Sequence, residues 1–119
     1  MKNIRSLMLA AVLCAVATTS ALAHALLDHA APGVGATVTA SPSELQLTFS
    51  QEIVPAFSGA EVSTAEGAPI VTAKPAGSGN TLHVGLAQPL KPGVYKVSWH
   101  VTSIDTHHSS GTYKFTIAP

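Results

Sequence analysis

Hydrophobic and polar residues alternate along several short stretches of this chain, most clearly between residues 94 and 103, in the sequence VYKVSWHVTS. In an extended strand, residues two apart share one face. The apolar face would carry Tyr95, Val97, Trp99 and Val101, and the polar face Lys96, Ser98, His100 and Thr102. We therefore expect a strand here with one buried side.

The same alternation predicts strands at residues 45–49, 82–86 and 113–117, and weaker strands near residues 25–31, 59–64 and 69–73. Segments rich in proline, glycine and serine separate them. About seven short strands in a small domain favour an all-β fold, a seven-stranded antiparallel Greek-key β-sandwich or barrel of the immunoglobulin-like or cupredoxin-like kind. The expected aromatic core residues are Trp99, Phe49, Phe57 and Phe115.

The first 23 residues read as a secretory signal peptide. Lys2 and Arg5 precede an apolar run over residues 7–16, and Ala21-Leu22-Ala23 would precede the cut. The run is too short for a comfortable membrane span, so we expect a released, periplasmic protein that is not membrane-embedded. The mature domain would cover residues 24–119.

Composition limits the partners and the sources of stability. Residues 24–119 hold six acidic residues and four lysines, a formal charge of −2, so a nucleic-acid partner is not expected. The single cysteine, Cys14, lies in the predicted signal peptide, which leaves no disulfide in the mature domain.

Histidines carry the candidate chemistry. Cleavage after Ala23 would give His24 a free α-amine beside its imidazole, two nitrogen ligands on one residue. Asp105 and His107 lie two apart, so in an extended segment their side chains would converge. Three nitrogens and one carboxylate oxygen suit Cu(II), whereas Cu(I) prefers sulfur, and both methionines precede residue 24.

Plainer readings remain open for each residue. Asp105 could simply bond backbone amides in a polar turn, and His24 could be a frayed first residue. His83 and His100 fall on outward faces and His29 has the wrong parity for an inner face, so all three are assigned to solvent. His108 should point away from His107, and its role as an alternative ligand stays open.

Catalytic motifs do not stand out. The serines include no Gly-x-Ser-x-Gly elbow, and no phosphate-cradling glycine loop is present. We therefore expect a binding protein and not an enzyme.

The mature chain closely resembles the CopC copper-resistance family of periplasmic proteins. The resemblance rests on the start HALL, on LQLTFS at residues 45–50, and most specifically on LKPGVYKVSWHVTSIDTHHSSGTYKF at residues 90–115. It implies a seven-stranded Greek-key β fold and one Cu(II) per mature chain, held by His24, Asp105 and His107. It also implies an inner-membrane partner of the CopD type.

Three departures from the family pattern bear on the site. The chain has no methionine-rich loop for Cu(I). Gln51 stands where a glutamate often follows the second strand, and Glu52 comes one residue later, so an assisting role for that carboxylate is in doubt. His108 occupies a position that is usually not histidine, which leaves room for a weak second site.

These observations predict a periplasmic protein that sequesters or carries Cu(II) in copper resistance or homeostasis. Two alternatives come from other classes. One is a copper-dependent oxidative enzyme of the histidine-brace type, which shares only the amino-terminal histidine. The other is a metal-free immunoglobulin-like structural module, which the fold alone would allow.

Overall fold

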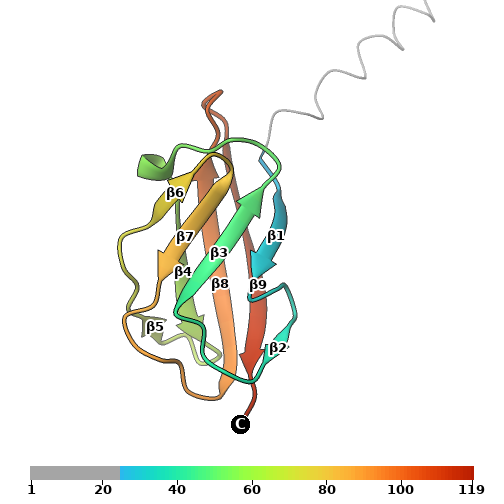
Figure 1. Ribbon diagram of the computed structural model, residues 1–119, viewed down its shortest axis with the longest axis vertical. Coiled ribbons are helices and arrows are strands. Elements are labelled where there is room, and N and C mark those ends of the chain that lie inside the picture. The colour runs from blue at the N-terminus through green and yellow to red at the C-terminus, as the bar shows by residue number, and fades with distance from the viewer. Residues whose placement is uncertain (1–24) are drawn as a thin grey trace, which may run out of the picture.

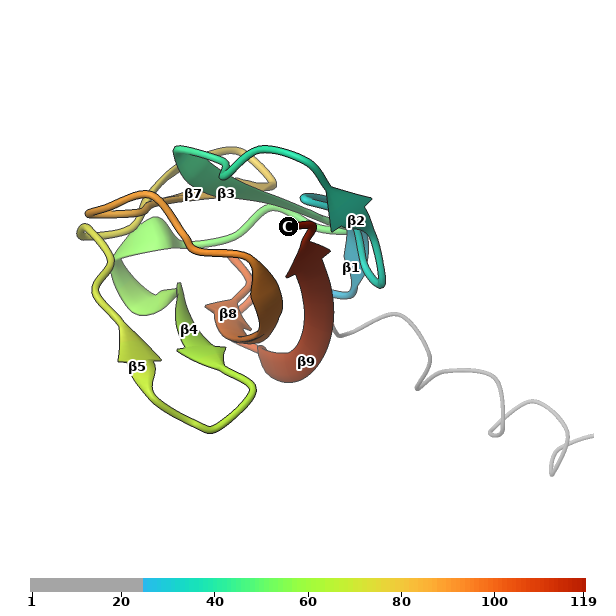
Figure 2. The same cartoon turned by 90° about the horizontal axis from the view of Figure 1, so that it is seen from below.

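The computed structural model describes residues 25–119, which form two β-sheets packed face to face (Figures 1 and 2). The predicted signal peptide, residues 1–23, and the predicted ligand His24 lie outside the described residues. The all-β sandwich expected from the alternation is confirmed.

One sheet has four strands, in the order β1-β3-β7-β6. These strands are β1 (Leu27–Ala31), β3 (Glu44–Phe49), β7 (Thr81–Gly85) and β6 (Ala76–Ser78). All neighbouring pairs in this sheet are antiparallel.

The other sheet has five strands, in the order β2-β9-β8-β4-β5. These are β2 (Thr37–Val38), β9 (His108–Ile117), β8 (Gly93–Thr102), β4 (Gly59–Thr64) and β5 (Pro69–Ile70). Its pairs are antiparallel except for β2 and β9, which run parallel. A 3-10 turn, η1 (Pro55–Phe57), precedes β4.

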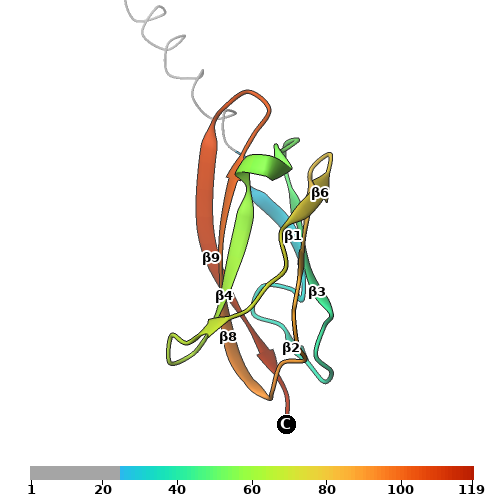
Figure 3. The ribbon, with the colours of Figure 1, turned by 90° about the vertical axis from the view of Figure 1, so that its left-hand side faces the viewer.

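The long β8–β9 hairpin positions the turn that holds Asp105 and His107, the two candidate ligands of the described chain. Ten residue pairs join the two strands, from Gly93 with Ile117 to Thr102 with His108. The turn between the strands lies at one end of the sandwich, together with the start of β1 and η1 (Figures 1 and 3). A rigid two-strand ladder therefore fixes the position of that turn.

The core lies between the sheets and follows the predicted alternation. On β8, Tyr95, Val97, Trp99 and Val101 are buried, while His100 is exposed. Phe49 packs edge-on against Trp99 with ring centroids 5.2 Å apart, and Tyr95 stacks on Phe115 at 5.7 Å. The placement of these aromatic residues in the core is confirmed.

Phe57 is an exception, and the prediction that it belongs to the core is wrong. Its side chain is 68 % exposed. Phe57 ends η1, whose residues are not buried, and no strand alternation turns it toward the interior. Aromatic character alone was the reason for the prediction.

The strand bounds also differ from the predicted ones at three places. The short strand β6 falls in a segment that was read as a turn, and the short strand β2, which follows another such segment, was not predicted. The last strand begins at His108, several residues before the predicted start, because serines and a glycine pair with β8 as well as apolar residues do. Thr102, predicted to face solvent, is 8 % exposed because η1 and β9 cover it.

Candidate metal centre

The turn between β8 and β9 is closed by backbone hydrogen bonds. The amide of Thr106 donates to the carbonyl of Ser103 at 2.9 Å, and the amide of Ser103 donates to the carbonyl of His107 at 2.9 Å. Thr106 has a φ of 74°, which is uncommon for a β-branched residue. The extended geometry that we assumed for residues 105–107 is therefore wrong, because the chain reverses there.

The reversal nevertheless brings together the two side chains that the sequence singled out. Nδ1 of His107 lies 3.2 Å from Oδ2 of Asp105. About half of each side chain is exposed, 49 % for His107 and 48 % for Asp105. A tight turn, and not strand parity, produces the predicted convergence.

The carboxylate of Asp105 accepts hydrogen bonds from residues of its own turn. The Ser103 hydroxyl donates to Oδ1 of Asp105, and the His107 amide donates to the same oxygen at 3.4 Å. The hydrogen bond from Ser103 is the main cause that holds the pKa of the Asp105 carboxyl below its usual value. Desolvation opposes it, and the hydrogen bonds and charge of His107 lower the pKa further. The carboxylate is thus ionised and fixed in orientation.

Ser103 is a site residue that the sequence reasoning missed. It is 1 % exposed, and its hydroxyl also lies 3.2 Å from the carbonyl oxygen of His107. The only available signal was its position two residues before Asp105, where a serine or threonine hydroxyl can bond locally. Such bonds are too common in turns to predict from one sequence.

The donor pair fits a metal ion of the borderline kind. Nitrogen and oxygen ligands bound at about 2.0–2.2 Å on adjacent positions of one metal stand about 3 Å apart. The observed separation of 3.2 Å between the imidazole nitrogen and the carboxylate oxygen matches this spacing. Imidazole and carboxylate together suit Cu(II) or Zn(II) and complete only part of either ion's shell.

The described chain begins at the same end of the sandwich as this turn. Ala25 is fully buried, and Leu26 exchanges hydrogen bonds with Ser50, its amide donating to Oγ at 2.8 Å. The segment that follows Ser50 then runs beside the turn, because the Ile104 amide donates to the carbonyl of Glu52 at 3.1 Å. His24 directly precedes this anchored start and lies outside the described residues.

The remaining histidines lie elsewhere. His29 and His100 are exposed, as predicted. His83 is partly covered, because its Nδ1 lies 3.3 Å from Oε1 of Glu44. His108 begins β9, and its Nδ1 lies 2.9 Å from the Thr102 hydroxyl, so it points away from the turn as expected.

Within residues 25–119, no three His, Cys, Asp or Glu side chains gather closely enough to hold a metal ion by themselves. A metal ion bound by Asp105 and His107 would therefore need further ligands. In the same part of the chain, no helix has the length and apolar character of a membrane span.

Comparison with known proteins assigns the family. A family model described as the CopC domain matches residues 27–118. Protein YobA of Escherichia coli K12 is 40 % identical over 113 residues, which cover 92 % of this chain and 90 % of that protein. Copper resistance protein C of Xanthomonas campestris pv. juglandis is 36 % identical over 114 residues, with 89 % of each chain covered.

Solved structures agree with this assignment. The crystal structure of CopC from Methylosinus trichosporium OB3b superposes with a TM-score of 0.76 at 30 % identity, covering 81 % of this chain and 95 % of that one. PcoC, a methionine-rich copper resistance protein from Escherichia coli, gives 0.73 at 31 % identity, covering 80 % and 99 %. Sequence, fold and family model lead to one conclusion: the chain belongs to the CopC family, and its function is related to copper.

Proposed function

We propose that the protein binds one Cu(II) ion at the end of the sandwich formed by the β8–β9 turn and the chain start, and that it sequesters or carries this ion in the periplasm. The observation that supports this most strongly is the approach of His107 Nδ1 to Asp105 Oδ2, 3.2 Å apart in a turn stabilised by Ser103. Copper is the cargo, and the protein's task is to hold and release it.

His24 would complete the ligand set. After removal of residues 1–23, its α-amine and its imidazole would add two nitrogens to the His107 nitrogen and the Asp105 oxygen. Anchoring of the next two residues, through burial of Ala25 and the Leu26–Ser50 hydrogen bonds, supports such a role because it restricts where residue 24 can lie.

The donor types favour the oxidised ion. Nitrogen and oxygen ligands stabilise Cu(II), whereas Cu(I) sites use cysteine and methionine, which residues 24–119 lack. A site that must release its cargo also gains from ligands that take up protons, because imidazole and amine bind metal only when unprotonated. We propose transfer to an inner-membrane protein of the CopD type, with no catalytic step.

One affinity comparison tests the proposal. Cu(II) binding is measured by competition with a chelator for a chain that begins at His24 and for the same chain preceded by one alanine, with each amino terminus confirmed by mass. The added residue turns the His24 amine into an amide, so we expect a loss of at least about 100-fold, or about 2.7 kcal/mol, without a change of fold. Equal affinity of the two chains would contradict the proposed ligand set.

A further inference from the structure

Two histidines follow one another at the end of the β8–β9 turn, and they differ in their surroundings. His107 lies in the turn, 3.2 Å from Asp105, whereas His108 begins β9 and pairs with Thr102 across the ladder. Both histidine side chains are exposed. Because the two residues are adjacent, a metal ion at the turn could take either imidazole unless one of them is held away.

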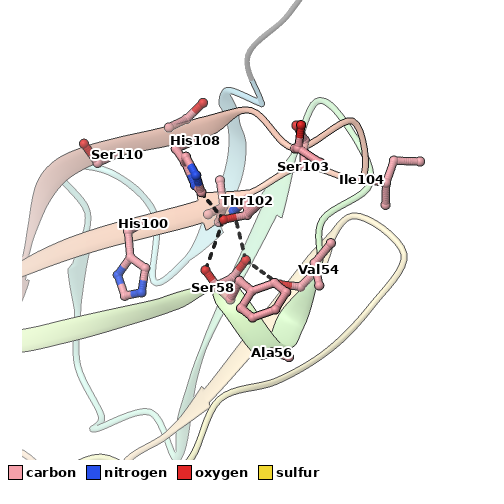
Figure 4. A pocket seen from close by; sticks show the side chains of 13 residues that line it. Val54, Ala56, Ser58, His100, Thr102, Ser103, Ile104, His108 and Ser110 are labelled. Atoms are coloured by element: carbon pink, nitrogen blue, oxygen red, sulfur yellow. Dashed lines mark hydrogen bonds between the residues drawn. The ribbon is translucent and has the colours of Figure 1, made fainter.

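The hydroxyl of Thr102 holds the ring of His108 (Figure 4). Oγ1 of Thr102 lies 2.9 Å from Nδ1 of His108. The same hydroxyl donates its single proton to the carbonyl of Phe57 at 3.3 Å, so toward His108 it acts as the acceptor. Nδ1 of His108 therefore carries the proton in the neutral ring, and in this arrangement it has no lone pair to offer a metal ion.

Thr102 is itself fixed through its backbone. Its amide donates to Oγ of Ser58 at 3.2 Å, and its carbonyl accepts a hydrogen bond from the amide of Val54 at 2.8 Å. The Ser58 hydroxyl in turn donates to the carbonyl of Val54 at 2.7 Å. Ser58 and Thr102 are both buried, with 7 % and 8 % of their surface exposed. An acceptor held at several points keeps its position, and it therefore fixes the ring of His108 as well.

The ring of His108 and the two turn ligands face different spaces. His108 and Thr102 line a surface hollow of about 730 Å³, together with residues of η1 and β8 (Figure 4). Neither Asp105 nor His107 lines this hollow. The hydrogen bond to Thr102 therefore keeps the imidazole of His108 on the side of the hollow, away from the space between Asp105 and His107.

We propose that Thr102 is a positioning residue that selects the copper ligand: it holds His108 out of the turn, so that His107 alone supplies an imidazole from this segment. The inference rests on the proposed function, because it concerns the choice of ligand for the copper ion at the turn. Without the hydroxyl, the ring of His108 is released and competes with His107 for that ion. One hydrogen bond of this kind shifts such an equilibrium about fivefold.

A set of Cu(II) affinities tests this selection. Thr102→Val removes the hydroxyl and keeps the shape of the side chain. In a chain that begins at His24 and already carries His107→Ala, we expect Thr102→Val to raise the Cu(II) affinity about fivefold, because the released His108 then replaces the missing imidazole. Adding His108→Gln should cancel this gain. The matched control Thr112→Val, at an exposed threonine of β9, should give no gain.

A tautomer measurement tests the tether in the unmodified chain without metal. At about pH 8, where an ordinary imidazole is neutral, nitrogen NMR should find the proton of His108 on Nδ1. Thr102→Ser, which keeps the hydroxyl, should give the same tautomer and no gain in the His107→Ala background. A proton on Nε2 would overturn the proposal. So would a loss of affinity on Thr102→Val that does not depend on His108, because a merely structural role predicts that result.

The two proposals give different results when they fail. If His107→Ala does not weaken Cu(II) binding, the proposed function is wrong, and this inference falls with it. If His107→Ala weakens binding and Thr102→Val brings no gain, the copper site stands and only the selection by Thr102 is overturned.

Discussion

Two carboxylate–imidazole pairs in this protein have similar interatomic distances, but they differ in the hydrogen bonds that hold the carboxylate in place. His107 lies 3.2 Å from Asp105, and His83 lies 3.3 Å from Glu44. Their exposures are also comparable, 49 % and 48 % for the first pair and 37 % and 50 % for the second. Distance and exposure alone would give the two pairs the same function.

The difference lies in the hydrogen bonds that each carboxylate accepts from the residues around it. Asp105 receives hydrogen bonds from the Ser103 hydroxyl and the His107 amide inside a closed turn, and its pKa is lowered. Glu44 extends from the first position of β3, and in the described part of the chain its carboxylate has only the contact with His83. A ligand set needs fixed geometry more than proximity, since an exposed pair contributes little by itself.

Replacing His107 should have the largest effect. His107→Ala removes one imidazole ligand, and we expect the Cu(II) affinity to fall at least about 100-fold, or about 2.7 kcal/mol. The measurement is a competition titration with a chelator, and His83→Ala is the matched control. A loss in His83→Ala as large as that in His107→Ala would remove the distinction between the two pairs.

Replacing the carboxylate of Asp105 should have the next largest effect. Asp105→Asn keeps the shape and one oxygen acceptor for Ser103 but removes the charge, so we expect the Cu(II) affinity to fall about 10- to 100-fold, or about 1.4–2.7 kcal/mol. Glu44→Gln, the equivalent change in the other pair, should leave the affinity unchanged. Unaltered binding by Asp105→Asn would show that the oxygen of Asp105 is not a ligand.

Removing the hydrogen bond from Ser103 to Asp105, while both proposed ligands stay in place, should have an intermediate effect. Ser103→Ala deletes the hydrogen bond that contributes most to the low pKa of Asp105, so that pKa should rise toward its usual value. A carboxyl group whose pKa is lowered in the folded protein stabilises the fold at pH values above its usual pKa. This stabilisation is lost as the pH falls through the lowered pKa. We therefore expect a higher Asp105 pKa by NMR titration and a Cu(II) affinity reduced up to about tenfold. An unchanged pKa would mean that Ser103 does not position the carboxylate.

The smallest effect should come from removing the contact between His83 and Glu44. His83→Gln removes the contact with Glu44 on the surface of the four-stranded sheet. We expect Cu(II) affinity within about twofold of the unmodified chain and a change in the free energy of unfolding of at most about 1 kcal/mol by urea denaturation. A larger loss of stability would show that this pair is not a simple surface contact.

The sequence predicted the sandwich well because alternation has one physical meaning in a half-buried strand. Tyr95, Val97, Trp99 and Val101 had to share a face, and they line the core. The pattern could not foresee the exposure of Phe57 or the burial of Thr102. Both depend on where the 3-10 turn lies against the sheet, and that contact is distant in sequence.

The approach of Asp105 and His107 was predicted, but its geometry was not. The Asp-x-His spacing correctly paired Asp105 with His107, yet the reason given, an extended segment, was wrong. Thr106 adopts a positive φ, which could not be predicted because β-branched residues rarely do so. The supporting hydroxyl of Ser103 and the orienting hydroxyl of Thr102 emerged only from the folded hairpin, because neither belongs to a motif that is rare enough to recognise.

The most direct test of the central claim is an electron paramagnetic resonance spectrum of one equivalent of Cu(II) bound to the chain that begins at His24, recorded beside His107→Ala and His83→Gln. We predict an axial spectrum with couplings to three nitrogens, which His107→Ala reduces by one nitrogen and His83→Gln leaves unchanged. A spectrum that His107→Ala does not alter, or one that shows a mixture of weak sites, would contradict the assignment of copper to the turn between β8 and β9.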